Sequence, residues 1–149
     1  MIESEHSTAL DHPAATVFAF LTDLEARSTW ITGIQDIRVT PHGPARPGTS
    51  YFESGKFSGF KSEKTMRVTQ YEQDRQLTLE TAGDAKPFYR MSYRVEPVSS
   101  GACRVHSRVE IGGAPKAAEL FMRKGVNKSL QEDLERLGSV LASWAASAS

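Results

Sequence analysis

Four ionisable side chains have types and positions that suit acid/base chemistry in a pocket: His6, Tyr93, Glu119 and Arg123. Imidazole titrates close to neutral pH, and a cavity can shift the pKa of an ionisable group that lines it. If the chain is an enzyme, we expect its acid or base among these residues, although the sequence alone assigns none of them a catalytic role. The alternative for His6 is an imidazole at the open end of a sheet, bonded to water or to backbone.

Glu119 and Arg123 stand four residues apart, which places them on one face of a helix. They can pair with each other in solvent, which is the simpler interpretation, or face a polar ligand at the mouth of a pocket. Gly125 follows shortly afterwards, and a glycine inside a helix weakens it. A bend at Gly125 would turn Leu120 and Phe121 inward instead.

Other catalytic and cofactor chemistries find no support in the sequence. A G-x-S-x-G nucleophile elbow, a P-loop and a dinucleotide fingerprint are all absent. Cys103 is the only cysteine, and it precedes an arginine without a recognisable base. No two histidines stand at ligand spacing with a carboxylate or a cysteine. We therefore expect neither a metal site nor a bound cofactor.

The element that must position these groups is a long helix from Pro115 to about Trp144. Its apolar residues recur at steps of four and three, as one stripe of a helix requires: Leu130, Leu134, Leu137, Leu141 and Trp144. Continued toward the start of the helix, the stripe includes Glu119, Met122, Arg123 and Val126. The opposite face is polar, and we expect it in water: Lys128, Glu132, Asp133 and Arg136. Such a helix needs a broad apolar surface to pack on.

Strand patterns supply that surface. Residues of the two faces of a strand alternate with a period of two near 2–10, 37–39, 51–57, 61–72, 77–79, 89–95 and 105–111. In the first stretch the inward set is Ile2, Ser4, His6, Thr8 and Leu10, and near residue 90 it is Tyr89, Met91, Tyr93 and Val95. Two short helices are expected after the first strand. The first begins at Pro13, and the second follows a Thr22–Glu25 capping box and ends near Trp30.

Length and charge limit the class of protein. The 149 residues favour one domain spanning 1–149. Eighteen basic residues balance eighteen acidic ones, so no net positive field favours nucleic acid. The first residues show no signal peptide, and no stretch reaches the length of a membrane span. We expect a cytoplasmic protein, monomer or homodimer, with neither nucleic acid nor an integral membrane segment.

Five segments, taken in order, carry a resemblance to a known family. They are Leu10-Asp11-His12-Pro13, Val17 to Asp23 (VFAFLTD), Trp30, Val95-Glu96-Pro97 and Asp133 to Leu137 (DLERL). With this order and spacing the chain resembles the polyketide cyclase/dehydrase-like group of the START superfamily, also called the SRPBCC or Bet v 1-like group. The resemblance covers nearly the whole chain. It implies an α+β helix-grip fold, in which a seven-stranded curved antiparallel sheet surrounds a long C-terminal helix and two short helices follow the first strand.

The resemblance also implies a ligand site, namely a cavity between the sheet and the C-terminal helix that binds a small hydrophobic or amphipathic molecule for transport or sequestration. The alternative is an enzyme of the polyketide cyclase, aromatase or dehydratase type in the same cavity. Residues expected at the wall are Trp30, Phe52, Met66, Met91, Tyr93 and Met122, for each of which ordinary core packing is the simpler alternative. Polar candidates are His6, Ser107, Glu119 and Arg123. With the first and last strands as neighbours, as the resemblance implies, His6 and Ser107 can bond a ligand carbonyl or hydroxyl.

Overall fold

The computed structural model describes residues 1–57, 60–85 and 87–148. The first strand β1 (Ile2–Leu10) is followed by α1 (Ala14–Thr22), a 3-10 turn η1 (Leu24–Ala26) and α2 (Arg27–Trp30). Six strands come next: β2 (Ile34–Thr40), β3 (Ser50–Phe57), β4 (Phe60–Glu72), β5 (Gln76–Thr81), β6 (Phe88–Ser99) and β7 (Ala102–Gly112). The chain then forms α3 (Lys116–Ala148). This is the predicted order of elements.

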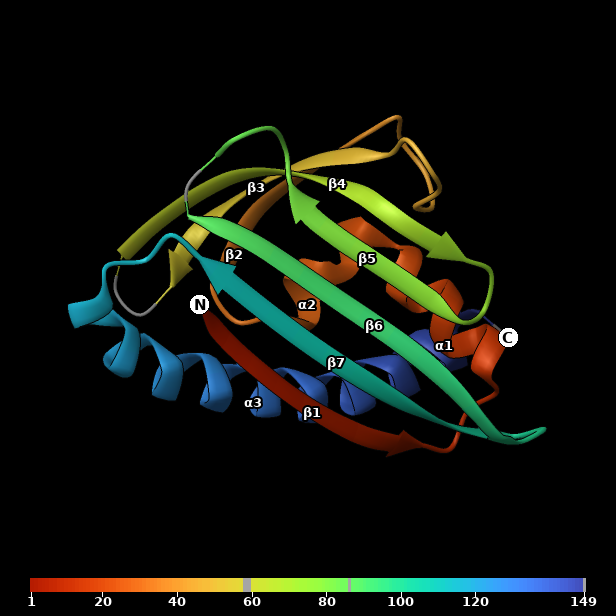
Figure 1. Ribbon diagram of the computed structural model, residues 1–149. Helices are drawn as coiled ribbons and strands as arrows, with labels where there is room; N and C mark the ends of the chain where they lie inside the picture. Colours follow the sequence, from red (N-terminus) through yellow and green to blue (C-terminus); the bar gives the residue numbers. More distant parts are fainter. Residues whose placement is uncertain (58–59, 86, 149) are drawn as a thin grey trace.

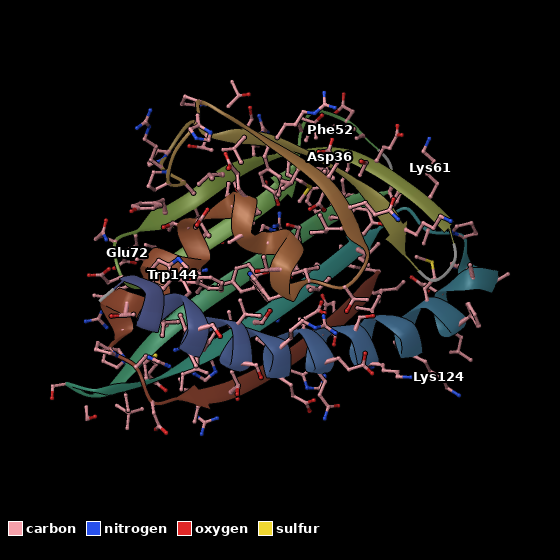
Figure 2. The ribbon with its side chains drawn as sticks, turned by 180° about the vertical axis from the view of Figure 1, so that it is seen from behind. Asp36, Phe52, Lys61, Glu72, Lys124 and Trp144 are labelled. Atoms are coloured by element: carbon pink, nitrogen blue, oxygen red, sulfur yellow. The ribbon has the colours of Figure 1, made fainter. Side chains whose placement is uncertain are left out.

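The strands form one seven-stranded antiparallel sheet in the order β1-β7-β6-β5-β4-β3-β2. From β2 to β7 each strand pairs with the next along the chain, and β1 pairs with β7. Figure 1 shows the sheet in front of the helices, and Figure 2, seen from behind, shows α1, α2 and α3 together on the inner side of the curved sheet. The predicted helix-grip fold is confirmed.

The register places the predicted inward residues of β1 against β7. Ile2 pairs with Ile111, His6 with Ser107 and Leu10 with Cys103. Ile2 and Leu10 are buried in the core. A sheet with one face on a core buries alternate residues, so a slip of one residue would expose this whole set.

The leucine stripe of α3 meets the core as predicted. Leu130, Leu134, Leu137 and Leu141 are all buried, and all but Leu130 belong to the main cluster of core side chains. Trp144 packs edge-on against Phe20 of α1, with ring centroids 5.2 Å apart. Among the described residues, no helix is both long and apolar enough to cross a lipid bilayer.

The first half of α3 and its polar face depart from the predictions in two places. Asp133, predicted in water, is buried with 8% of its surface exposed. Arg123, predicted on the inward stripe, is exposed, although Val126 on the same stripe is buried. The leucine stripe is therefore in the predicted register, but the buried face of α3 is wider than predicted and includes Asp133. The residues after α2 cover that side of α3 and form hydrogen bonds with it.

The structure also decides two local predictions, the bend at Gly125 and the capping box at Thr22. The helix α3 is continuous through Gly125, and Leu120 and Phe121 remain outward, each 73% exposed. The capping box predicted at Thr22 is wrong, because Thr22 ends α1 and its hydroxyl donates to the Ala19 carbonyl at 2.9 Å. A threonine in the last turn of a helix can bond back to its own helix in this way.

Candidate functional site

A cavity of about 100 Å³ lies between the sheet and the middle of α3. Its apolar wall includes Trp30, Ile31, Met91, Val109, Ile111, Val126 and Leu130. Its polar groups include Arg27, Glu53, Lys64, Tyr89, Tyr93 and Asp133. A cavity of this order of size takes a small organic group, and a few polar side chains among apolar ones can fix the orientation of that group.

A larger depression of about 830 Å³ adjoins the cavity. The two share Ser62, Lys64 and Tyr89 in their walls. On the side of α3 the depression is bordered by Phe121 and Met122. Lys64 and Tyr89 therefore stand between the inner cavity and the outer surface.

Arg27 is the charged residue at the inner end of the cavity, and only 1% of it is exposed. Its Nη1 donates to the Tyr93 hydroxyl at 3.1 Å, and its Nη2 lies 3.5 Å from the Met91 sulfur. Three aromatic rings surround the guanidinium carbon, with centroids at 5.7 Å (Trp30), 6.0 Å (Tyr51) and 5.6 Å (Tyr93). These cation–π contacts partly compensate the lost hydration of the charge.

The charge states of this cluster follow from burial. Burial raises the pKa of Tyr51 well above the usual range and also raises the pKa of Tyr93, and the Arg27 charge offsets only part of the effect. Burial lowers the pKa of Arg27, but Tyr93, Tyr51 and Glu53 more than reverse this, so its pKa is raised. Near neutral pH two neutral phenols therefore lie beside the Arg27 cation, and of the two tyrosines Tyr93 lines the cavity.

Glu53 and Lys64 form an ion pair on the inner face, where β3 and β4 are paired. Lys64 Nζ lies 3.1 Å from Glu53 Oε1 and 4.2 Å from the centroid of the Tyr89 ring. The second oxygen of Glu53, Oε2, is buried and has no hydrogen-bond partner among the described residues. This oxygen can accept a proton or a hydrogen bond from a molecule in the cavity.

Asp133 is held at the α3 side of the cavity by the residues that follow α2. Its Oδ1 accepts from the backbone nitrogen of Thr32 at 3.0 Å and from the Thr32 hydroxyl at 2.9 Å. Arg136 Nη1 lies 3.4 Å from the same oxygen and also donates to the Trp30 carbonyl at 3.1 Å. Burial raises the pKa of Asp133, and the bonds from Thr32 and the Arg136 charge only partly oppose this.

The Thr32→Val variant is expected to raise the pKa of Asp133 further, because it removes a hydrogen bond that stabilises the carboxylate. A side-chain carboxyl NMR titration measures this directly. A raised pKa means that the folded chain holds the Asp133 proton more tightly than the unfolded chain. The contribution of Asp133 to stability is therefore greatest below its unfolded pKa and is lost as the pH rises through the folded pKa.

Thr29→Val is the matched control for this titration, because the Thr29 hydroxyl donates to Ala26 rather than to Asp133. It should leave the pKa of Asp133 unchanged. A normal pKa for Asp133 in the native chain would contradict the burial argument.

The structure brings three of the predicted wall residues together at the cavity: Trp30, Met91 and Tyr93. Met66 is fully buried in the core but is not part of the cavity wall. Phe52 and Met122 border the outer depression instead. That each wall residue contacts a ligand stays a prediction.

The predicted polar residues lie elsewhere. His6 and Ser107 are directly opposite each other on β1 and β7, as expected, but neither lines the cavity. The Ser107 hydroxyl is buried without a partner among the described residues. Glu119 Oε1 pairs with the N-terminal ammonium of Met1 at 2.6 Å rather than with Arg123, which is exposed.

Sequence reasoning missed Arg27, Glu53, Lys64 and Asp133. Two signals were present: Arg27 precedes Trp30 by three residues, which is one helical turn, and Glu53 alternates with the buried Tyr51 on β3. Because charged residues are mostly exposed in proteins, these four were not predicted at the cavity. Among the described residues, no group of three or more His, Cys, Asp or Glu side chains is arranged to hold a metal ion.

Comparisons with known proteins agree with this architecture. The chain is similar in structure to a START superfamily protein from Mycobacterium smegmatis (TM-score 0.80, 11% identity, 95% of this chain and 98% of that one). It is also similar to a protein from Nitrosomonas europaea (TM-score 0.76, 20% identity, 97% of this chain and 97% of that one). A third similar structure is the aromatase/cyclase Zhui from Streptomyces sp. R1128 (TM-score 0.69, 11% identity, 97% of this chain and 93% of that one). At these identities the similarity shows the fold.

A comparison with curated proteins finds no match. A family model does match, and it extends over residues 1–142, nearly the whole chain. That family is described as polyketide cyclase/dehydrase and lipid transport. Its extent, together with the seven-stranded sheet around α3, agrees with the resemblance seen in the sequence. The chain therefore belongs to the polyketide cyclase/dehydrase and lipid transport family, with the helix-grip fold of the START superfamily.

Proposed function

We propose that the chain binds a small amphipathic molecule, with its polar end in the inner cavity and its apolar part directed toward the outer depression. The observation that carries this proposal is a cavity with an apolar wall and a buried polar end, adjoining an open depression through shared residues. The inner space of about 100 Å³ is too small for a large ligand, so the rest of the molecule must extend past Lys64 and Tyr89. The family description, which includes lipid transport, supports the same proposal.

A second candidate function is acid/base catalysis of the polyketide cyclase type. One observation favours it, namely that ionisable groups of both signs converge on the cavity: Arg27, Glu53, Tyr93 and Asp133. In this proposal Arg27 polarises a ligand carbonyl, and the unpaired Glu53 Oε2 accepts a proton from the adjacent carbon. The similarity in fold to the aromatase/cyclase Zhui is compatible with this candidate.

Fluorescence of the neutral probe N-phenyl-1-naphthylamine tests binding in the cavity. The native chain is expected to bind it saturably, with one probe per chain. The Val126→Phe variant should weaken this binding at least about tenfold, because a phenyl ring on the buried wall occupies the space that the probe needs.

Val98→Phe is the matched control, since Val98 is 67% exposed on the far hairpin. Thermal melting of both variants checks that they remain folded. Absence of saturable binding to the native chain, or equal binding by the folded Val126→Phe variant, would rule out this cavity as the site. A poly-β-ketone probe that the chain binds and returns unchanged would count against the cyclase candidate alone.

A further inference from the structure

Among the buried charged groups that the structure describes at the cavity, one positive charge has no ionic partner. Glu53 is paired with Lys64 at 3.1 Å, and Asp133 is held by Thr32 and Arg136. Arg27 is the remaining buried charge. Among the described residues, no carboxylate oxygen lies within ion-pair distance of its guanidinium group, whose only hydrogen-bond partners are the Tyr93 hydroxyl and the Met91 sulfur.

An unpaired guanidinium in a dry interior is strongly unfavourable, because it cannot lose its proton to become neutral. The three aromatic rings around it supply attraction without neutralising the charge. The arrangement is therefore suited to a bound anion that restores the balance.

The hydrogen-bond inventory of Arg27 shows which edge the anion would occupy. Nη1 is used by Tyr93, Nη2 has only the weakly accepting Met91 sulfur, and Nε has no partner among the described residues. Nε–H and one Nη2–H lie on the same edge of a guanidinium and point in parallel. A carboxylate binds such an edge through both of its oxygens.

The neighbouring groups also limit the charge of the anion. Two of the rings around Arg27 carry buried donors that lack partners among the described residues, the Trp30 indole nitrogen and the Tyr51 hydroxyl, and Trp30 also lines the cavity. The free oxygen of Glu53 and the carboxylate of Asp133 line the same cavity and repel a second negative charge. A monoanion is thus favoured over a phosphate dianion.

We infer that the cavity selects an amphipathic carboxylic acid, bound as its carboxylate through the Nε and Nη2 edge of Arg27. The inference rests on the proposed function, since it names the chemical class of the molecule that occupies the same cavity. The apolar part of the acid lies between the sheet and α3 and leaves past Lys64 and Tyr89.

Competition against N-phenyl-1-naphthylamine with decanoate and 1-decanol, which share one chain and differ in the head group, tests this inference at neutral pH. Decanoate is expected to displace the probe from the native chain at a concentration at least about tenfold lower than 1-decanol. Arg27→Met, which replaces the charge by an apolar side chain of similar length, should abolish this preference while still binding 1-decanol. Arg123→Met, which removes an exposed arginine from α3, should retain the preference.

The outcomes separate the inference from the proposed function. Equal potency of decanoate and 1-decanol, failure of both to displace a bound probe, or a preference that survives in folded Arg27→Met would overturn the inference and leave the cavity a binding site. If the native chain binds no probe at all, both the proposed binding function and the inference about carboxylic acids are wrong.

NMR of the native chain gives a second test that does not depend on folding of the variant. The Nε–H resonance of Arg27 should move much further on addition of decanoate than on addition of 1-decanol, because a hydrogen bond to a charged carboxylate is stronger than one to a hydroxyl oxygen. A resonance that is unaffected by saturating decanoate would overturn the inference.

Discussion

Replacing Leu137 by alanine is expected to lower the free energy of unfolding by about 2–5 kcal/mol, which is the range for a leucine deleted from a packed core. Leu137 is fully buried at the centre of the α3 stripe, between Leu134 and Leu141. Its removal leaves a cavity that the rigid sheet on one side and the helix backbone on the other cannot fill. Urea denaturation measures the loss as a lower midpoint with an unchanged slope.

Leu120→Ala is the matched control for this prediction, because it removes the same side chain from the same helix at a site that is 73% exposed. We expect its effect to stay within about 0.5 kcal/mol. Similar losses for Leu137→Ala and Leu120→Ala would mean that the stripe does not carry the packing energy of α3.

Replacing Gly55 by alanine is the second substitution with a large expected effect. A Cβ atom on Gly55 would lie 1.8 Å from the carbonyl oxygen of Gly33, far inside van der Waals contact. Gly33 itself has φ +93°, a backbone conformation that favours glycine, and its carbonyl accepts from the Lys56 nitrogen at 2.9 Å. The backbones of β3 and the start of β2 must therefore separate in Gly55→Ala, at a cost of about 3 kcal/mol.

Thermal melting and probe binding together check this prediction. Both Gly33 and Gly55 line the inner cavity, so the displaced backbone should weaken binding of N-phenyl-1-naphthylamine as well as lower the melting temperature. Gly101→Ala in the β6–β7 turn is the control, since its Cβ would meet no atom within 4 Å. Unchanged melting of Gly55→Ala would show that the close approach of the two glycines is not required.

The apolar and the charged residues of the cavity are held in place by different interactions. Its apolar wall continues the core of the sheet, whereas its charged groups are held by bonds that cross between elements distant in the sequence. Asp133 and Thr32 are one example, and Arg27 and Tyr93 are another. Such contacts specify a unique geometry but stabilise little, because desolvation offsets most of their attraction. The buried charged groups are therefore compatible with the proposed binding function.

Local patterns in the sequence determined the helices and strands of this protein and their buried faces, and the family resemblance implied how they are arranged. The steps of four and three through Leu130, Leu134 and Leu137 specify one buried face of α3, and the structure buries that face. Alternation along β1 and β6 predicted which side chains face inward, and Ile2 and Tyr93 of these sets are buried. These predictions succeed because the period of a helix or strand and the burial of apolar residues are set by neighbours in the sequence.

Tertiary structure alone decided the polar part of the site. Asp133 belongs to the polar face that the sequence predicts for α3, and it is buried because the segment after α2 packs over it. Arg27 and Tyr93 are 66 residues apart and meet because α2 packs against the inner face of β6. Whether a charged side chain is solvated or buried depends on which distant element covers it, and no local period encodes that choice. The sequence therefore determined the elements and, through the family resemblance, the fold, whereas the charged groups that lie inside were decided by the packing of α2, β3 and α3.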